Sequence, residues 1–175
     1  MELRQTIMRD QTGQEGLNDL IKEIPNKGKM IEIGTFTGES TVIFGNHFKE
    51  VIGIDPMLQD YDLQDMTSKF NFNQVLEMFN DRTKEHKNIS LVQKTSDDAV
   101  KDFKDESYDF VYIDGIHQYT NVLSDIKNYL PKIKKGGVIG GHDYTSHWKG
   151  VKMAVDEVFG QPDKTFKDGS WIKFL

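Results

Sequence analysis

The stretch Lys29–Ser40, KMIEIGTFTGES, decides the fold of this chain. The apolar run over residues 30–33 predicts a short buried strand, Gly34 and Gly38 predict a turn, and a helix is expected to begin at Ser40. Backbone N–H groups at a turn that leads into a helix point toward the anionic part of a ligand. The sequence therefore predicts a ligand site at this turn.

A second strand, over residues 51–54, ends in Asp55, which comes 21 residues after Gly34. In Rossmann-type units an acid at about this distance binds a ribose hydroxyl. A dinucleotide site also needs the pattern G-x-G-x-x-G, whose second glycine lets the backbone approach a pyrophosphate. Phe36 holds that position here, and its ring would fill the space of the pyrophosphate. We therefore expect a ligand with one nucleoside and no diphosphate.

The spacing of Glu32, Gly34 and Gly38 resembles motif I of the class I S-adenosylmethionine (SAM)-dependent methyltransferases. The resemblance extends over residues 29–159 and is closest to a bacterial subgroup of small O-methyltransferase-like proteins. It also rests on three later segments, which are GIDP at 53–56, DFVYIDGIH at 109–117, and the glycine pair 136–137 followed by GHDY at 141–144.

Further strands and helices alternate along the chain and predict a mostly parallel sheet. The strands are expected at 89–92, 108–113 and 138–141, and the helices at 13–24, 72–79, 122–133 and 151–158, with the glycine pair 136–137 breaking the third of these. A hairpin of residues 165–166 and 171–174 closes the chain. The prediction is an α/β, Rossmann-like class I methyltransferase fold: a twisted sheet with an antiparallel C-terminal edge hairpin and helices on both faces.

We expect one domain over residues 1–175, with residues 1–28 as an N-terminal helical cap segment. Residues 1–12 are expected to fold over the mouth of the cofactor site. Residues 56–69 are irregular, and a connection of this length in a compact domain is often a lid or binding loop.

The resemblance implies that the glycine turn faces the methionine end of SAM, that Asp55 holds the ribose and that Ser96 lies at the adenine edge. Family members often carry an acid just before that serine, where this chain has Thr95. The implied cofactor-binding residues are Glu32, Gly34, Thr35, Gly38, Ser40, Asp55, Ser96 and Asp114.

Asp114 and Asp143 follow what should be neighbouring parallel strands, about 4.8 Å apart. Two such carboxylates repel each other unless a cation lies between them, and oxygen ligands suit Mg²⁺, Ca²⁺ or Mn²⁺. The region is similar to catechol-type and related sugar or macrolide O-methyltransferases, in which such acids hold a divalent ion that orients the acceptor hydroxyl. Those enzymes often place a further Asp or Asn ligand where this chain has Tyr144. In the alternative, Asp114 contacts the cofactor and Asp143 caps the next helix.

Histidines gather near the same strand ends. Methyl transfer is a direct displacement that needs positioning and removal of a proton, and histidine is the natural base. We predict that His142 and the neighbouring Asp143 form the catalytic pair. His117 is either a ligand or the start of a helix, and His147 completes the cluster. Aromatic side chains expected to line the acceptor pocket are Tyr119, Tyr144 and Trp148; for Trp148, ordinary packing within the loop is the alternative.

The composition excludes several classes of protein. The net charge is −6 with no long basic run, which argues against nucleic-acid binding. The absence of cysteine excludes disulfides, thiolate metal sites and cysteine nucleophiles. No stretch has the length of a signal peptide core or a membrane span, so we expect a cytoplasmic protein. The sequence leaves open whether the protein forms a homodimer.

These features predict a SAM-dependent methyltransferase (EC 2.1.1.-) that acts on a hydroxyl of a small-molecule acceptor, such as a sugar or secondary metabolite, with SAM as cofactor and Mg²⁺ or Mn²⁺ as an accessory ion. Two alternatives stay open at this point: an NAD(P)-dependent Rossmann oxidoreductase, against which Phe36 argues, and a catalytically idle SAM-binding protein.

Overall fold

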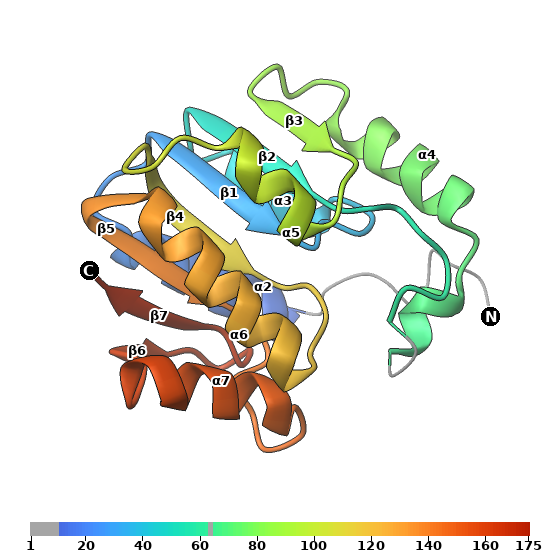
Figure 1. Cartoon of the computed structure of the whole chain (residues 1–175). Helices are drawn as coiled ribbons and strands as arrows, with labels where there is room; N and C mark the ends of the chain where they lie inside the picture. Colours follow the sequence, from blue (N-terminus) through green and yellow to red (C-terminus); the bar gives the residue numbers. More distant parts are fainter. Residues whose placement is uncertain (1–10, 63–64) are drawn as a thin grey trace.

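A single seven-stranded sheet forms the centre of the protein, for which a computed structural model describes residues 11–62 and 65–175 (Figure 1). The strand order is β3-β2-β1-β4-β5-β7-β6. The first five strands pair in parallel, whereas β7 is antiparallel to β5 and to β6. The strands are β1 Lys29–Ile33, β2 Glu50–Ile54, β3 Ile89–Val92, β4 Tyr108–Ile113, β5 Ile133–Gly141, β6 Lys164–Thr165 and β7 Trp171–Phe174.

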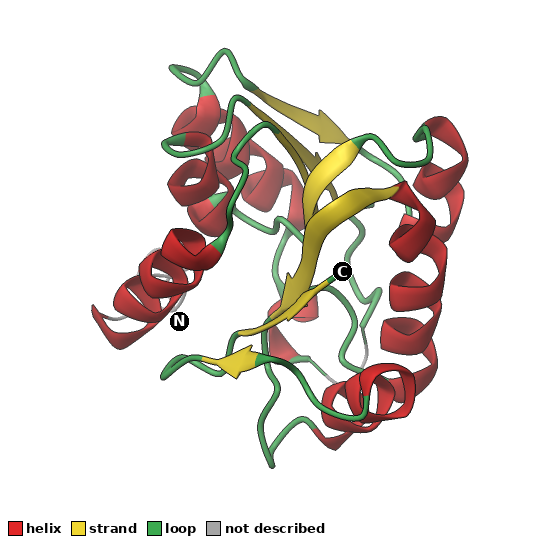
Figure 2. Ribbon diagram, turned by 90° about the vertical axis from the view of Figure 1, so that its left-hand side faces the viewer, coloured by secondary structure: helices red, strands yellow, loops and turns green. Residues whose placement is uncertain are grey.

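Helices cover both faces of this sheet, as Figure 2 shows in a view along its edge. The α-helices are α2 Gln11–Glu23, α3 Glu39–Gly45, α4 Phe72–Thr83, α5 Ser96–Ala99, α6 Tyr119–Tyr129 and α7 Lys149–Phe159. Short 3₁₀ turns occupy Met66–Lys69, Val100–Asp102 and Leu130–Lys132. The predicted fold class is thus confirmed, including the antiparallel C-terminal hairpin.

The side chains of β1 alternate between two apolar clusters because successive residues of a strand point to opposite faces. Met30 packs in a cluster with Leu17 of α2 and Phe44 of α3. Ile31 packs in the other cluster, to which α5, α6 and α7 contribute. Residues 11–23 therefore form part of the fold against the sheet. Residues 1–10, most of the stretch predicted to cover the cofactor mouth, lie outside the described residues.

The predicted helix over 122–133 is wrong at its C-terminal end. Helix α6 ends at Tyr129, a 3₁₀ turn containing Pro131 follows, and Ile133 already belongs to β5. Proline has no N–H to continue a helix. The pair Gly136-Gly137 lies inside β5 and does not break a helix. Between the pairs Tyr108–Ile133 and Phe110–Val138 the register shifts, and Gly136 (φ 77°) lies in this irregular stretch.

The topology brings the carboxyl ends of β1, β2, β4 and β5 to one edge of the sheet. The order reverses between β1 and β4, which is where open α/β sheets bind ligands. Backbone bonds continue past the strand ends: the Gly34 N–H donates to the Ile54 carbonyl, that of Asp114 to Ile33, and that of His142 to Ile113. Within the described residues, no helix has the length and apolar character needed to span a bilayer.

Candidate active site

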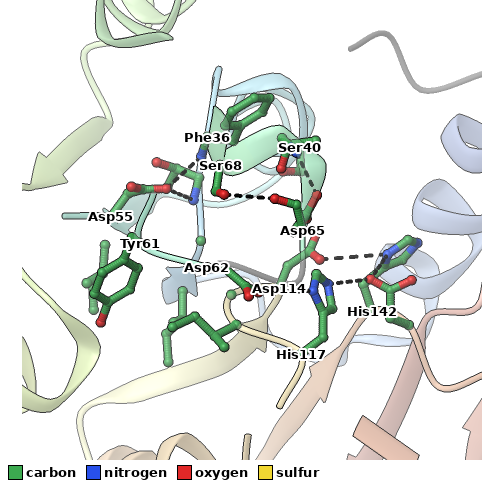
Figure 3. Close-up of a pocket in the computed structure, with 18 of the residues that line it drawn as sticks. Phe36, Ser40, Asp55, Tyr61, Asp62, Asp65, Ser68, Asp114, His117 and His142 are labelled. Carbon is green, nitrogen blue, oxygen red and sulfur yellow. Dashed lines mark hydrogen bonds and ion pairs between the residues drawn. The ribbon is translucent and has the colours of Figure 1, made fainter. Parts of the chain in front are cut away.

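A cavity of about 670 Å³ opens at this edge of the sheet (Figure 3). Its walls come from the glycine turn after β1, the segment after β2, the start of α5, the turns after β4 and β5, and the hairpin residue Asp168. Thr12 and Gly13 of α2 also line it. This size and position suit a small-molecule site.

The glycine turn passes very close to the strand-end turn that carries Asp114. Gly34 has φ 84°, and a Cβ atom there would lie 2.1 Å from the Asp114 carbonyl oxygen. Phe36 also has a positive φ, 46°, which is uncommon for a side chain of this size. Its ring lines the cavity and packs against Phe70 and Phe72, with centroids 6.3 and 6.0 Å away. Only glycine fits at position 34.

Asp55 holds the glycine turn in place from the end of β2. Its Oδ2 accepts the N–H groups of Thr35 (3.1 Å) and Phe36 (2.9 Å), and its Oδ1 accepts that of Met57 (2.8 Å). Burial raises the pKa of Asp55 and outweighs these backbone hydrogen bonds, which lower it. Asp55 and Thr35 both line the cavity, so the acid predicted to bind ribose lies at the wall while it organises the turn.

Glu32 lies beneath the turn and not at the cavity wall. Its side chain is fully buried, and its Oε1 accepts a hydrogen bond from the Ser40 hydroxyl at 2.5 Å. This contact ties β1 to the first turn of α3, and Ser40 lines the cavity. Gly38 is the N-cap of α3 with φ 79°, and a Cβ there would meet the Phe79 ring at 2.8 Å. Glu32 and Gly38 thus shape the turn from behind.

Two histidines and two aspartates gather where β4 and β5 end (Figure 3). The strands pair Ile113 with Gly141, so the residues that follow lie side by side. Asp143 Oδ2 lies 2.8 Å from His117 Nε2 and 3.2 Å from His142 Nδ1. His142 Nδ1 is also 3.7 Å from Asp114 Oδ1. The neighbouring acids predicted from the strand ends are therefore brought together.

His117 is held on three sides. Its Nε2 contacts Asp143, its Nδ1 lies 3.8 Å from Asp62 Oδ2, and its ring stacks on Trp148 at 4.0 Å between centroids. Burial lowers the pKa of His117, but the hydrogen bond and charge of Asp143 outweigh it and the net shift is upward. Burial likewise raises the pKa of Asp143, and the hydrogen bonds from His117 and His142 reverse this to hold it well below its usual range.

The cluster fits a divalent cation. Asp114, His117 and Asp143 each offer one ligand atom, and these atoms lie within 4.8 Å of one another. Two carboxylates and one imidazole suit Mn²⁺ and related ions, and the oxygens alone suit Mg²⁺. Asp143 has φ 62°, a strained conformation for a residue other than glycine, and such strain is concentrated at functional sites. The predicted pair Asp114 and Asp143 thus gains His117 as a third donor.

The three aromatic residues predicted for the acceptor pocket, Tyr119, Tyr144 and Trp148, do not line the cavity. The Tyr144 hydroxyl donates to Asp156 on α7, and that of Tyr119 donates to Glu157. Trp148 lies behind His117, and His147 meets the edge of Trp148 at 5.0 Å between centroids. These side chains turn toward α7 or the back of the cluster: Tyr119 is the first residue of α6, and the others lie in the connection between β5 and α7.

For several other residues that line the cavity, the sequence pattern gave little or no indication of a role in the site. Asp62 and Asp65 lie in the irregular segment after β2, and Asp168 lies in the closing hairpin, where Asp-Gly marks a turn. Asp125 lines the cavity from α6. Its signal was its spacing, since it shares the helix face of Val122, Ile126 and Tyr129. The predicted adenine contact, Ser96, lines the cavity as the first residue of α5.

A family model described as a methyltransferase domain matches residues 31–144. Among curated proteins, the uncharacterized protein R132 of Acanthamoeba polyphaga mimivirus is 32% identical over 139 residues, which are 73% of this chain and 58% of that protein. The uncharacterized protein y4gI of Sinorhizobium fredii is 38% identical over 53 residues, 30% of this chain and 6% of its own length. The chain thus spans less than two thirds of the curated relatives it matches.

Solved structures with low sequence identity share the fold. A putative methyltransferase from Streptococcus mutans, SMU.1697c in complex with SAH, superimposes with a TM-score of 0.64 at 16% identity, covering 96% of this chain and 100% of that one. A putative O-methyltransferase from Klebsiella pneumoniae gives 0.65 at 14% identity, covering 96% and 83%. Because the family model covers more than half of the residues, the chain belongs to the methyltransferase domain family.

Proposed function

We propose that this protein is a SAM-dependent methyltransferase that methylates a hydroxyl group of a small molecule, such as a sugar or secondary metabolite, with the help of a divalent cation. The observation that carries the proposal is the position of the Asp114–His117–His142–Asp143 cluster. It opens into the same cavity as the glycine turn and Asp55. One cavity therefore brings together residues suited to a nucleoside and residues suited to an acceptor.

The charge of the cavity supports SAM as the donor. Of the described residues that line it, none is lysine or arginine, whereas many are acidic. SAM carries a sulfonium and an ammonium group, so such a wall favours it over an anionic dinucleotide. The family assignment supports SAM as well, and SMU.1697c, which has the same fold, was solved with SAH. The membership argues against the oxidoreductase alternative.

The histidine–aspartate cluster, where the acceptor is proposed to bind, supplies a base with a fixed orientation. His142 Nδ1 faces Asp143 at 3.2 Å, so Nδ1 carries the proton and Nε2 is the basic nitrogen. In the reaction the acceptor oxygen bonds to the methyl carbon, the carbon–sulfur bond breaks, and the hydroxyl proton passes to His142 Nε2. A cation held by Asp114, His117 and Asp143 would lower the pKa of the acceptor hydroxyl and orient it. Asp143 also stabilises the imidazolium that forms.

Transfer of a labelled methyl group from SAM to a panel of polyols, sugars and phenols, with and without Mg²⁺ or Mn²⁺, tests the proposal. His142→Ala should lower kcat by about 10²–10⁴-fold, the usual contribution of a general base, while SAH still binds. His147→Ala is the matched control, because this histidine does not line the cavity, and it should keep wild-type activity. Equal rates in the two variants would exclude His142 as the base. A wild type that binds SAM but methylates no hydroxyl compound would exclude the proposed reaction.

A further inference from the structure

The cavity has a second end, away from the histidines, that the proposed chemistry does not use. Pro56, Leu58 and Tyr61 line it from the segment after β2, while Ser96 and Asp125 line it from α5 and α6. In Figure 3, Asp55 and Tyr61 lie on one side of the cavity and His117 and His142 on the other. This end combines apolar and aromatic surface with a few polar groups, as a site for a flat heterocycle requires.

Asp125 is a buried acid at this end. Its residue is 4% exposed, and its carboxyl group accepts a hydrogen bond from the Ser96 side chain. The neighbouring acid Asp97 is exposed and is held by Ser124 (2.9 Å) and Asn128 (2.9 Å). Ser96 is itself fixed, because its carbonyl accepts the Tyr129 hydroxyl at 2.8 Å. Asp125 is therefore placed rigidly against the cavity.

The proposed cofactor leads from the glycine turn to this point. Asp55 lies between the turn and the Asp125 end, since it bonds the turn backbone on one side and lies near Tyr61 on the other. If the methionine part of SAM lies on the turn and the ribose on Asp55, the base must point toward Asp125. This step depends on the proposed function, namely on SAM as the donor.

We propose that Asp125, supported by Ser96, binds the N1–N6 edge of the adenine of SAM and is the residue that selects this base. Thr95, at the position where an acid was expected before Ser96, instead caps α5 by accepting the Asp98 N–H. The acid proposed to bind the adenine thus comes from α6, which lies beside α5.

A neutral carboxyl group matches both atoms of this edge of adenine. N1 accepts a hydrogen bond and the adjacent N6 amino group donates one, so a partner that serves both atoms donates and accepts side by side. A protonated carboxyl does both, whereas a carboxylate only accepts and would oppose N1. The pKa of Asp125 is raised to about 7, because burial and the charge of Asp97 raise it by more than the Ser96 hydrogen bond lowers it. Affinity for the cofactor should therefore fall as the pH rises above 7.

The titratable groups around Asp125 also favour a raised pKa for this acid. The other titratable side chains at this end are Asp97 and Asp98 on α5, Asp55 after β2, Tyr61 in the following segment and Tyr129 on α6. All of them are acids, and each negative charge among them disfavours a second negative charge on Asp125. None of the described residues lining the cavity offers a lysine or arginine to offset it.

Calorimetric titration with SAH between pH 6.0 and 8.5 tests the inference. The wild type should lose affinity above pH 7, by up to about tenfold per pH unit for one proton. Asp125→Asn, whose amide donates and accepts at any pH, should bind as tightly as the wild type at pH 6 and show no such loss. Asp19→Asn, an exposed acid of α2 that does not line the cavity, is the control and should keep the pH dependence of the wild type.

A second experiment tests the selection of adenine directly with an analogue of SAH. S-inosylhomocysteine carries an N1–H donor and an O6 acceptor, the reverse of adenine, so an ionised Asp125 can accept from it. The preference of the wild type for SAH over this analogue should shrink as the pH rises from 6 to 8.5.

The outcomes separate the two claims. SAH binding to the wild type that does not change with pH, or an equal pH dependence in Asp125→Asn, would overturn the role of Asp125 while the cofactor assignment stands. No SAH binding at any pH would overturn the proposed function and this inference with it.

Discussion

His117 Nε2 lies 2.8 Å from Asp143 Oδ2, and this oxygen is shared with His142 Nδ1 at 3.2 Å. One carboxylate thus orients two imidazoles that come from different turns of the sheet edge. The two rings are not equivalent, because His117 is enclosed by Trp148 and Asp62, whereas His142 extends toward Asp168, whose Oδ2 lies 4.0 Å from His142 Nε2. His117 is placed as a structural donor or metal ligand, and His142 faces the cavity.

Binding of a divalent cation is predicted to stabilise the fold through this cluster. At a Mn²⁺ concentration of 100 times Kd, binding to the native state alone adds about 2.7 kcal/mol to the free energy of unfolding. For a domain of this size that corresponds to a rise in Tm of about 5–10 °C. Asp114→Asn and Asp143→Asn should lose most of this rise in melts followed by circular dichroism. Asp19→Asn, an exposed acid of α2, is the control, and shifts of the same size in all of these proteins would refute the site.

Gly34→Ala should destabilise the protein far more than Gly136→Ala. Both glycines have a positive φ, 84° and 77°, so both substitutions carry a backbone cost of about 1 kcal/mol. At position 34 the added Cβ would also lie 2.1 Å from a backbone carbonyl oxygen, whereas nothing lies within 4 Å at position 136. We expect an additional loss of about 2 kcal/mol or more, and loss of SAH binding, only in Gly34→Ala. Urea unfolding and calorimetry measure the two effects; similar losses in both variants would contradict the close approach.

Ser40→Ala should cost about 1–3 kcal/mol in the free energy of unfolding, because it removes a hydrogen-bond donor from the buried Glu32 carboxylate. Thr41→Val, one residue along the same helix, provides the comparison. Its hydroxyl is buried, with no hydrogen-bond partner among the described residues, so replacing it should be neutral or stabilising. Denaturant unfolding of the two variants measures the difference. Equal effects would mean that the Ser40–Glu32 contact adds nothing to stability.

The stability of the protein should decline between about pH 4 and pH 7 through Asp125. The pKa of this acid is raised from 3.8 to about 7 in the native state, so the native state binds its proton more tightly than the unfolded chain does. The resulting stability is fully present below pH 4 and is lost as the pH rises through 7. Asp125→Asn does not titrate and should therefore gain, relative to the wild type, on the order of 2–4 kcal/mol from pH 4.5 to 8. Melts without ligand across this range measure it, and a constant difference would contradict the shift.

The sequence predicted the fold well where its signals are periodic. The apolar runs of β1 to β4 and the Asp-Gly turn of the hairpin predicted the right sheet. The rule that ligands bind at strand ends predicted, from the sequence alone, that Asp114 and Asp143 lie close together. The error at residues 130–137 has a physical cause. Leu130 and Ile133 continue the helical spacing of α6, but Pro131 and the pairing of Ile133 with Tyr108 override it.

The details of the site depend on contacts that no local pattern encodes. The stacking of Trp148 on His117 joins two loops, and the φ of 62° at Asp143 is set by its tertiary surroundings. Asp125 could have been found from its place on the apolar face of α6, since a charged residue there must be buried or paired. The roles predicted for Ser96 and Asp55 toward a ligand stay predictions that the experiments above address.

The acidic lining of the cavity has a consequence for release of the product. Methyl transfer turns a positively charged sulfonium into a neutral thioether, so the spent cofactor has one positive charge fewer than the donor that entered. A wall rich in aspartates and without a described lysine or arginine holds the charged species more strongly than the neutral one. Fresh donor should thus displace spent donor readily at low ionic strength, and this advantage should shrink as salt screens the wall.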